Sequence, residues 1–527
     1  MFKFGVRNFR RLKAVPPIGI VPITILVGRN SSGKSSFLRA LPLLRQSVQT
    51  RTSSPVLWFG DLVDFGSYRG AVSDNDLREP ISFLFHLDVV EVERRNRFFR
   101  YTNAMSGDHL KLENVDVEVS IAWDDDESDV RLQKVSVASE MGAFTLELTK
   151  AGEVSALKWN GANILELFQN IRLFVPRGSI FPDVIAADKK TKTVSSTFIE
   201  MYYPPDVREL ASRLSAAVAP LVDKRLSKTN ALPELCGEFL SLPLLSKEVL
   251  TTYLKSVSVR SWKKLISKLL EKDPKNSLAE IRKIHTAAQF LPMLRAVNAS
   301  LRRLIGQVLY IGPARARSER YYRYQELAVS EIDPDGKNFA MFLNSLRGSQ
   351  LDELSNWIEG LFGYRIDLSR TEGHISINLV EGKSTTNIVD TGYGVSQILP
   401  VLGQIWWAAN RDRDIRTRSE RAAISILAIE QPELHLHPAH QVFLADALVA
   451  APEGRRQRTH FLIETHSETL VNRLGQLVSE EKLSPEDVQI VLFEPDETDP
   501  RRTNTRIATF GENGALIDWP YGFFQPG

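Results

Sequence analysis

The chain has 527 residues, of which 43% are hydrophobic, and its 66 Lys and Arg nearly balance its 64 Asp and Glu, giving a net charge of +2. This composition is ordinary for a globular protein and argues neither for nor against a nucleic-acid partner. The single cysteine, Cys236, excludes an internal disulfide and a four-cysteine zinc site, and no apolar run approaches the roughly 20 residues that span a bilayer. Because residues 1–4 lead directly into a strand pattern without a signal peptide, we expect a soluble, cytoplasmic protein without a membrane partner.

The first 48 residues predict a compact unit of strand, turn, strand, loop and helix. Residues 2–10 alternate between apolar and polar, which predicts an edge strand leading towards a nucleotide. Residues 23–27 form a short β-branched apolar run typical of a buried strand, and residues 36–41 have the apolar spacing of a helix.

Between that strand and helix, residues 28–35 fit the P-loop pattern G-x-x-x-x-G-K-[ST] at every fixed position. Such a loop aims backbone N–H groups and the positive end of the helix dipole at a phosphate chain. Lys34 is expected to reach the β- and γ-phosphates of ATP, and Ser35 to ligate Mg²⁺. The residues of this segment expected to bind ATP are Gly28, Arg29, Asn30, Ser31, Ser32, Gly33, Lys34, Ser35 and Ser36.

The middle of the chain changes its periodicity twice. Residues 80–160 alternate with period two and predict an antiparallel sheet with one buried face. Residues 205–308 have helical spacing, and prolines including Pro292 are expected to divide them into short helices. The basic residues of this region are compatible with a nucleic-acid or partner surface, although a solvated helix face is the simpler interpretation; they are Arg260, Lys263, Lys264, Lys268, Lys272 and Lys275.

A basic and aromatic run follows a predicted strand at residues 309–311. It mixes guanidinium and aromatic groups, which can bind a phosphate backbone or stack on bases. An interdomain or nucleotide-facing loop is an equally good interpretation. The run comprises Arg315, Arg317, Arg320, Tyr321, Tyr322, Arg323 and Tyr324.

Three later segments supply what a P-loop needs. Residues 422–430 form an apolar strand that ends in Glu430, as expected of an acid that faces Mg²⁺ held by Ser35. Residues 459–467 form another strand, which ends in Thr-His-Ser. The histidine of this ending, His466, can reach the γ-phosphate or the attacking water. Residues 390–400 are glycine-rich and lead into a helix, with Ser396 expected at its N-cap, giving a second backbone-amide anion site.

In this order the motifs resemble the ABC ATPase superfamily, and their wide separation resembles its SMC/RecF/OLD branch. The resemblance implies a P-loop NTPase of ABC ATPase head type, an α/β fold with a mixed sheet, an antiparallel β lobe and an inserted helical domain. The corresponding division is 1–200, 201–308 and 309–527. It also implies Mg²⁺-dependent ATP binding and head-to-tail dimers or higher oligomers. In such dimers a signature motif contacts the opposite protomer's ATP; its residues here are Gly392, Gly394, Ser396 and Gln397.

The match is narrower in residues 310–313, 430–438, 463–468 and 517–524, which look like a family of prokaryotic OLD-like AAA-type ATPases found in phage-defence systems. This resemblance implies a switch or scaffold that controls a separately encoded nuclease or toxin. The competing hypothesis is a SMC/RecF-like DNA-repair ATPase that acts directly on DNA, since the basic residues above leave a nucleic-acid partner open.

Two departures from the family pattern stand out. Where ABC ATPases have a catalytic glutamate after the Mg²⁺ acid, this chain has Gln431, whose amide cannot act as a general base. Either Glu433 or Glu464 supplies the base, or hydrolysis is slow, and we expect the latter. The family's Toprim nuclease domain is not expected after His466, and residues 493–499 are expected to form a solvated loop. His435 and His437 are interpreted as structural or dimer-interface residues.

Overall fold

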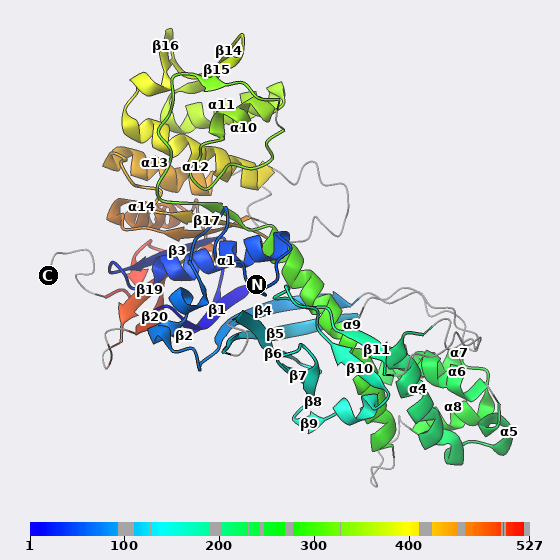
Figure 1. Cartoon of the computed structure of the whole chain (residues 1–527). Coiled ribbons are helices and arrows are strands. Elements are labelled where there is room, and N and C mark those ends of the chain that lie inside the picture. Colours follow the sequence, from blue (N-terminus) through cyan, green and yellow to red (C-terminus); the bar gives the residue numbers. More distant parts are fainter. Residues whose placement is uncertain are drawn as a thin grey trace.

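A computed structural model gives the fold of the chain (Figure 1). The structure describes residues 1–92, 110–125, 129–189, 203–229, 231–242, 247–268, 278–326, 328–410, 424–450, 459–496, 499 and 502–520. Lys272, Lys275 and residues 521–524 of the C-terminal motif therefore lie outside the described residues. In the part of the chain that the structure describes, no helix has both the length and the apolar composition needed to cross a bilayer.

A seven-stranded mixed sheet forms the centre of the molecule (Figure 1). Its first five strands are parallel and its last two pair antiparallel. Because carboxyl ends of parallel strands share one edge, segments hundreds of residues apart meet beside the P-loop. In spatial order the strands are β12 (Leu309–Ile311), β17 (Ser425–Glu430), β18 (Thr459–Glu464), β3 (Ile23–Gly28), β19 (Val488–Pro495), β20 (Thr503–Phe510) and β21 (Leu516–Ile517).

Helices cover both faces of this sheet, which explains why its parallel strands are apolar throughout rather than alternating. Side chains such as Ile426 and Ala428 join the cluster around α1 (Lys34–Gln49) on one face. Leu427 and Ile429 join the opposite cluster. The helices of that second face are α12 (Tyr393–Asn410), α13 (Pro438–Val449) and α14 (Glu468–Ser479).

A second, antiparallel sheet of eight strands lies beyond α1, so that this helix is held between two sheets (Figure 1). It confirms the antiparallel arrangement predicted for residues 80–160. Its order is β2 (Leu12–Gly19), β1 (Lys3–Phe9), β4 (Ile81–Val92), β5 (Leu110–Asp124), β6 (Asp129–Ser139), β7 (Gly142–Leu148), β8 (Val154–Trp159) and β9 (Ala162–Asn163).

The prediction that residues 2–10 form an edge strand is wrong. β1 pairs with β2 on one side and with β4 on the other, so it lies inside the sheet. The edge belongs to β2, which contains Pro16 and Pro17. Because proline has no N–H to donate, it is tolerated at an edge, and its presence hides this strand from a sequence pattern.

Residues 205–306 are mostly helical, as predicted, but Pro292 does not divide them. It lies inside α9 (Ala279–Gly306), which runs for 28 residues. An interior proline costs a helix about 3 kcal/mol, and extensive burial of the apolar side of α9 offsets this cost. The shorter helices at the far end of α9 are α4 (Pro205–Val218), α5 (Lys224–Ser227), α6 (Ala231–Leu240), α7 (Lys247–Ser256) and α8 (Arg260–Ser267) (Figure 1).

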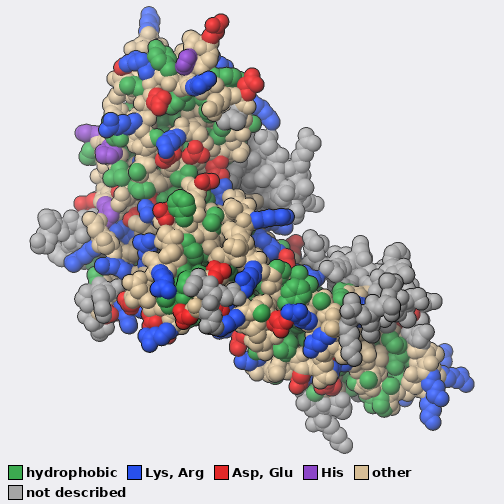
Figure 2. All heavy atoms as spheres, viewed as in Figure 1, with side chains coloured by type: hydrophobic (Ala, Val, Ile, Leu, Met, Phe, Trp, Pro, Cys, Tyr) green, Lys and Arg blue, Asp and Glu red, His purple; other side chains and the backbone are tan. Residues whose placement is uncertain are grey.

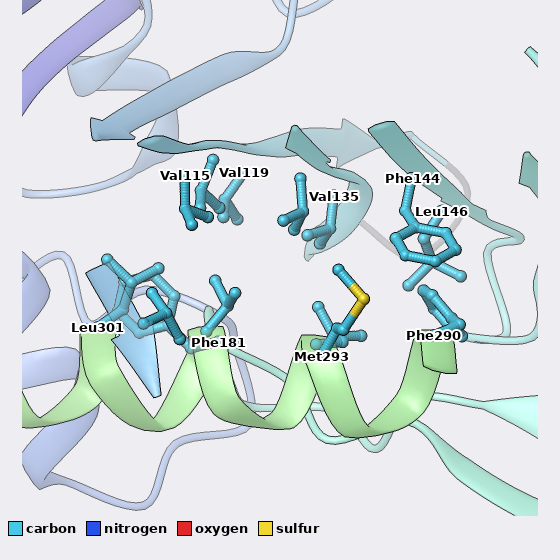
Figure 3. Packing of buried hydrophobic residues seen from close by; sticks show 14 of the residues in the cluster. Val115, Val119, Val135, Phe144, Leu146, Phe181, Phe290, Met293 and Leu301 are labelled. Atoms are coloured by element: carbon cyan, nitrogen blue, oxygen red, sulfur yellow. The ribbon is translucent and has the colours of Figure 1, made fainter. Parts of the chain in front are cut away.

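The buried side of α9 packs against the antiparallel sheet (Figure 3). The ring of Phe290 lies 5.4 Å from that of Phe144 on β7, and Met293 points towards Val135 on β6. We expect Phe290→Ala to lower the free energy of unfolding by about 3–5 kcal/mol, because it removes a buried ring and leaves a cavity. Chemical denaturation measures this change. The matched control is Phe59→Ala, since Phe59 is 67% exposed and should change stability by no more than about 0.5 kcal/mol. Equal effects would contradict this packing.

The basic side chains of α8 lie on its exposed face, as both interpretations predict. On α8, Lys263 and Lys264 are exposed whereas Trp262, Leu265 and Ile266 are buried. Acidic and basic side chains are interspersed over the face of the molecule seen in Figure 2. A solvated amphipathic helix accounts for both observations.

A smaller lobe lies between β12 and α12 and carries a four-stranded sheet. The lobe includes the end of the basic and aromatic run, since residues 322–323 of that run form its shortest strand. Its elements are β13 (Tyr322–Arg323), α10 (Phe339–Ser345), α11 (Gly348–Phe362), β14 (Arg365–Thr371), β15 (His374–Glu381) and β16 (Ser384–Asn387).

Candidate nucleotide site

The P-loop has the predicted context: β3 ends at Gly28 and α1 begins at Lys34. Gly28 and Gly33 have φ values of 155° and 99°, a region that favours glycine. A Cβ on Gly28 would lie 2.4 Å from the carbonyl oxygen of Phe493, so the glycine also permits close packing on β19. The hydroxyl of Thr503 on β20 donates to the Ser32 carbonyl at 2.7 Å, which fixes the loop from its other side.

Lys34 is held in the loop. Its Nζ donates to the carbonyl oxygens of Gly28 and Arg29 at 3.0 and 2.9 Å, and its side chain is 3% exposed. Burial lowers the pKa of Lys34, and the nearby Glu464 carboxylate opposes this effect. A phosphate chain bound in the loop would offer this amine anionic oxygens in place of neutral carbonyls, and these are stronger acceptors.

The Ser35 hydroxyl contacts a carboxylate that has an oxygen without a partner in the part of the chain that the structure describes. The Ser35 hydroxyl donates to Oε1 of Glu464 at 2.9 Å. Oε2 of Glu464, Oε2 of Glu433 and the Ser32 hydroxyl are buried and have no hydrogen-bond partner among the described residues. Hydroxyl and carboxylate oxygens are what Mg²⁺ prefers, so the residues present fit ATP with Mg²⁺. Within the described chain no three His, Cys, Asp or Glu side chains converge on a metal position, so phosphate oxygens and water would complete the shell.

Glu430 ends β17 as predicted, but its carboxylate is already engaged. Arg39 donates to its two oxygens at 2.6 and 2.7 Å, and the Tyr310 hydroxyl donates at 2.8 Å. The sequence paired Ser35 with Glu430 as the Mg²⁺ ligands, whereas the structure brings Ser35 to Glu464. The reason is topological: β18 lies between β17 and β3, so its end is nearer to the P-loop.

The segment after β17 packs tightly against the end of β18. Gln431 has a φ of 41°, and its backbone N–H donates to the Glu464 carbonyl at 2.8 Å. Oε1 of Glu433 accepts from the backbone N–H of His466 at 2.7 Å, and burial raises the pKa of Glu433. Desolvation, followed by the positive charge of Lys34, lowers the pKa of His466. Glu430, Gln431 and His466 thus come together at the P-loop edge of the sheet.

The glycine-rich segment begins α12 four positions earlier than a Ser396 cap requires. The helix starts at Tyr393, so Ser396 lies in its first turn and donates its hydroxyl to the Tyr393 carbonyl at 2.8 Å. The expectation that Ser396 is the N-cap is therefore wrong, because Tyr393 and Gly394 already adopt helical geometry. Gln397 donates to the Ala316 carbonyl at 3.1 Å, which attaches this helix to the basic and aromatic run.

Gly394 is the glycine of this segment that the packing requires. A Cβ there would lie 2.6 Å from the His435 carbonyl oxygen, whereas a Cβ on Gly392 would have no atom within 4 Å. We expect Gly394→Ala to destabilise the protein by about 1–3 kcal/mol, because the backbone of the loop after β17 must move. Thermal unfolding measures this, with Gly392→Ala as the matched control of near-native stability. Equal effects of the two substitutions would contradict the close approach.

The basic and aromatic run serves mainly as a connector. Arg315 is buried and donates to the Glu430 carbonyl at 3.1 Å. Arg320 forms two hydrogen bonds with Asp390, just before the glycine-rich segment. These contacts favour the interdomain and nucleotide-facing interpretation for the arginines, while Tyr321 and Tyr324 remain 59% and 42% exposed.

The remaining sequence candidates have structural positions. His437 caps α13 by accepting from the Ala439 N–H at 3.3 Å, and the ring of exposed His435 lies 5.0 Å from that of Tyr393. Phe493 corrects the expectation of a solvated loop at residues 493–499, since it lies inside β19 and is fully buried. Residues 497–498 of that segment lie outside the described residues.

Arg39 and Tyr310 hold Glu430 in place, and the sequence interpretation missed both contacts. Arg39 follows Ser35 by four positions, so both lie on one face of α1, and this spacing was the available signal. No sequence spacing links Tyr310 to Glu430. The two residues meet only because β12 pairs with β17 in the sheet.

Two family models of ATPase domains match separate parts of the chain. A family model described as "AAA domain, putative AbiEii toxin, Type IV TA system" matches residues 23–131, and one described as "AAA ATPase domain" matches residues 248–471. The P-loop between β3 and α1, and the mixed central sheet with its adjoining antiparallel sheet, confirm the predicted α/β fold class.

Solved structures of SMC heads are similar to this chain at low identity. The Smc head domain of Pyrococcus furiosus with an extended coiled coil, bound to the C-terminal domain of ScpA, is 12% identical. Coverage is 97% of each chain and the TM-score is 0.31. The SMC head domain from Thermotoga maritima is 10% identical, with 97% of this chain and 98% of that chain covered and a TM-score of 0.31. No curated protein matches the sequence.

Proposed function

We propose that this chain is an ATP-binding and ATP-hydrolysing switch that requires Mg²⁺. The observation that carries the proposal is the convergence at one sheet edge of the P-loop, Lys34, Glu464 and the buried oxygens without partners. Each is a group that a nucleotide with its cation would satisfy. Lys34 and the loop amides bind and orient the phosphates, and His466 lies where it can sense the γ-phosphate.

Turnover is slow in this proposal, because Gln431 occupies the position of the general base. An amide holds no proton-accepting charge, and a positioned general base contributes about 10²–10⁴-fold to a rate. The ATP-bound state is then long-lived. Its conformation, rather than the product of hydrolysis, is the output of the switch. Steady-state phosphate release tests this: turnover well above about 1 s⁻¹, within the ordinary enzyme range, would contradict it.

The switch is proposed to act between two copies of the chain. The glycine-rich start of α12 would complete the nucleotide site of a second protomer, through Gly392, Gly394, Ser396 and Gln397. Tyr393 is 47% exposed beside this segment, which leaves the helix start accessible. Dimerisation would therefore depend on ATP, and light scattering with and without Mg²⁺ and ATP measures it.

The proposed biological role is control of a separately encoded nuclease or toxin in antiviral defence. The "putative AbiEii toxin, Type IV TA system" model over residues 23–131 supports a toxin or defence context. We further propose the three-part division 1–200, 201–308 and 309–527, with the helical part inserted. Affinity purification with ATP bound tests the role: wild type should retain a partner that Lys34→Ala loses.

A second candidate function is a DNA-repair ATPase of SMC/RecF type that acts directly on DNA. Exposed Tyr321 and Tyr324, together with Lys263 and Lys264, favour it, because aromatic and basic groups bind nucleic acid. The two functions differ in salt dependence. A steep fall in DNA affinity with salt would support direct action on DNA, whereas negligible binding would support the effector switch.

A further inference from the structure

Two glutamates end neighbouring parallel strands at the nucleotide site, in opposite electrostatic surroundings. Glu430 on β17 and Glu464 on β18 are direct register partners. Their side chains are 2% and 3% exposed, so neither carboxylate is solvated. A buried carboxylate needs a compensating cation or several hydrogen bonds, and the two residues differ in what the chain itself supplies.

Glu430 is fully compensated by the protein. Both of its oxygens accept from the Arg39 guanidinium in a two-bond arrangement, and Oε1 also accepts from Tyr310. Such paired hydrogen bonds are the strongest that a carboxylate makes with a side chain. The hydrogen bonds to Glu430 raise the pKa of Arg39, as expected for a tightly held ion pair. Glu430 thereby ties α1 to the end of β17.

Glu464 is compensated only in part. Oε1 accepts from the Ser35 hydroxyl, while Oε2 is buried without a partner among the described residues. The nearest amine, Nζ of Lys34, is 3.9 Å from Oε1 and donates instead to the carbonyls of Gly28 and Arg29. Burial, and to a smaller extent the charge of Glu430, raise the pKa of Glu464. A cation beside Ser35 would remove this deficit.

We infer that Glu464, rather than Glu430, is the carboxylate that serves the Mg²⁺ held with Ser35, and that Glu430 is a positioning residue that fixes α1 through Arg39. The inference rests on the proposed ATPase function. Glu464 accepts from the Ser35 hydroxyl and has a second oxygen without a partner among the described residues. Both oxygens of Glu430 are instead occupied by Arg39. The metal itself supplies charge neutralisation at the phosphates.

The inference predicts that Mg²⁺ coupling is lost at one acid only. The affinity of a fluorescent ATP analogue is measured in Mg²⁺ and in EDTA for wild type, Glu464→Gln and Glu430→Gln, and the ratio of the two dissociation constants gives the coupling. Glu464→Gln should reduce this ratio by about tenfold or more, as loss of a metal-orienting group does. Glu430→Gln should leave it within about threefold of wild type. The reverse pattern, or an unchanged ratio in Glu464→Gln, would overturn the inference.

Thermal unfolding without nucleotide gives an independent measure. Glu464→Gln removes a buried charge that has one hydrogen bond and only a distant ion pair, so its Tm should fall little or not at all relative to wild type. Glu430→Gln removes the anionic partner of Arg39, so its Tm should fall by several degrees. If Glu430→Gln does not fold, Tyr310→Phe replaces it, since this variant keeps both carboxylates and should retain wild-type Mg²⁺ coupling. A larger fall in Tm for Glu464→Gln than for the Glu430 or Tyr310 variant would contradict the inference.

The two measurements separate the inference from the function on which it rests. If wild type binds no ATP analogue with or without Mg²⁺, the proposed ATPase function fails. The order of the Tm values would still decide which acid the protein compensates internally.

Discussion

Replacing Lys34 with alanine is expected to weaken ATP binding by about 100-fold or more, because each charge-assisted hydrogen bond is worth about 1.5–3 kcal/mol. The amine lies at the start of α1, held by the carbonyls of Gly28 and Arg29 and shielded from solvent. Its position requires only a small movement to reach a phosphate chain in the loop. Isothermal titration calorimetry with ATP and Mg²⁺ measures the loss.

The control for this variant is Lys263→Ala, which removes an exposed lysine of α8. It should bind ATP as wild type does. Circular dichroism tests that Lys34→Ala is folded, since truncation leaves the carbonyls of Gly28 and Arg29 without this donor. A loss smaller than about threefold, equivalent to less than 1 kcal/mol, would show that Lys34 does not bind phosphate.

Replacing Gln431 with glutamate is expected to raise ATP turnover by about 10²-fold, the lower end of what a positioned general base contributes. The backbone of Gln431 is held against the end of β18 by its hydrogen bond to the Glu464 carbonyl, so a new carboxylate would start from the same place. The change replaces an amide by a proton acceptor of nearly the same size. Steady-state phosphate release at saturating ATP measures the rate.

Two controls identify the source of any increase. Gln431→Ala should leave turnover at or below the wild-type rate, because it adds no proton acceptor. The double variant Lys34→Ala with Gln431→Glu should lose the gain, because it does not retain ATP. An unchanged rate in Gln431→Glu would instead assign the proton acceptor to Glu433 or Glu464, and would remove the stated reason for slow turnover.

The sequence predicted the elements whose signals are local. The P-loop between β3 and α1, the apolar strand that ends at Glu430 and the strand before His466 each depend on contiguous residues, and all three appear where expected. β2 was missed because Pro16 and Pro17 obscure its pattern. The lobe from α10 to β16 had no prediction, since its strands lack a clear functional motif. Pro292 led to the wrong prediction of a helix break, because tertiary packing of α9 overrides a local helix breaker.

By itself the sequence determined that this chain has a nucleotide loop, an acid at a strand end and a histidine at another, because such motifs are set by backbone conformation over a few residues. Only the tertiary structure decided which of the acids faces which cation. That depends on the order β17, β18, β3 in the sheet, on Arg39 reaching across from α1 and on Tyr310 from β12. Electrostatic compensation is a property of neighbours in space, and these neighbours lie in distant parts of the chain.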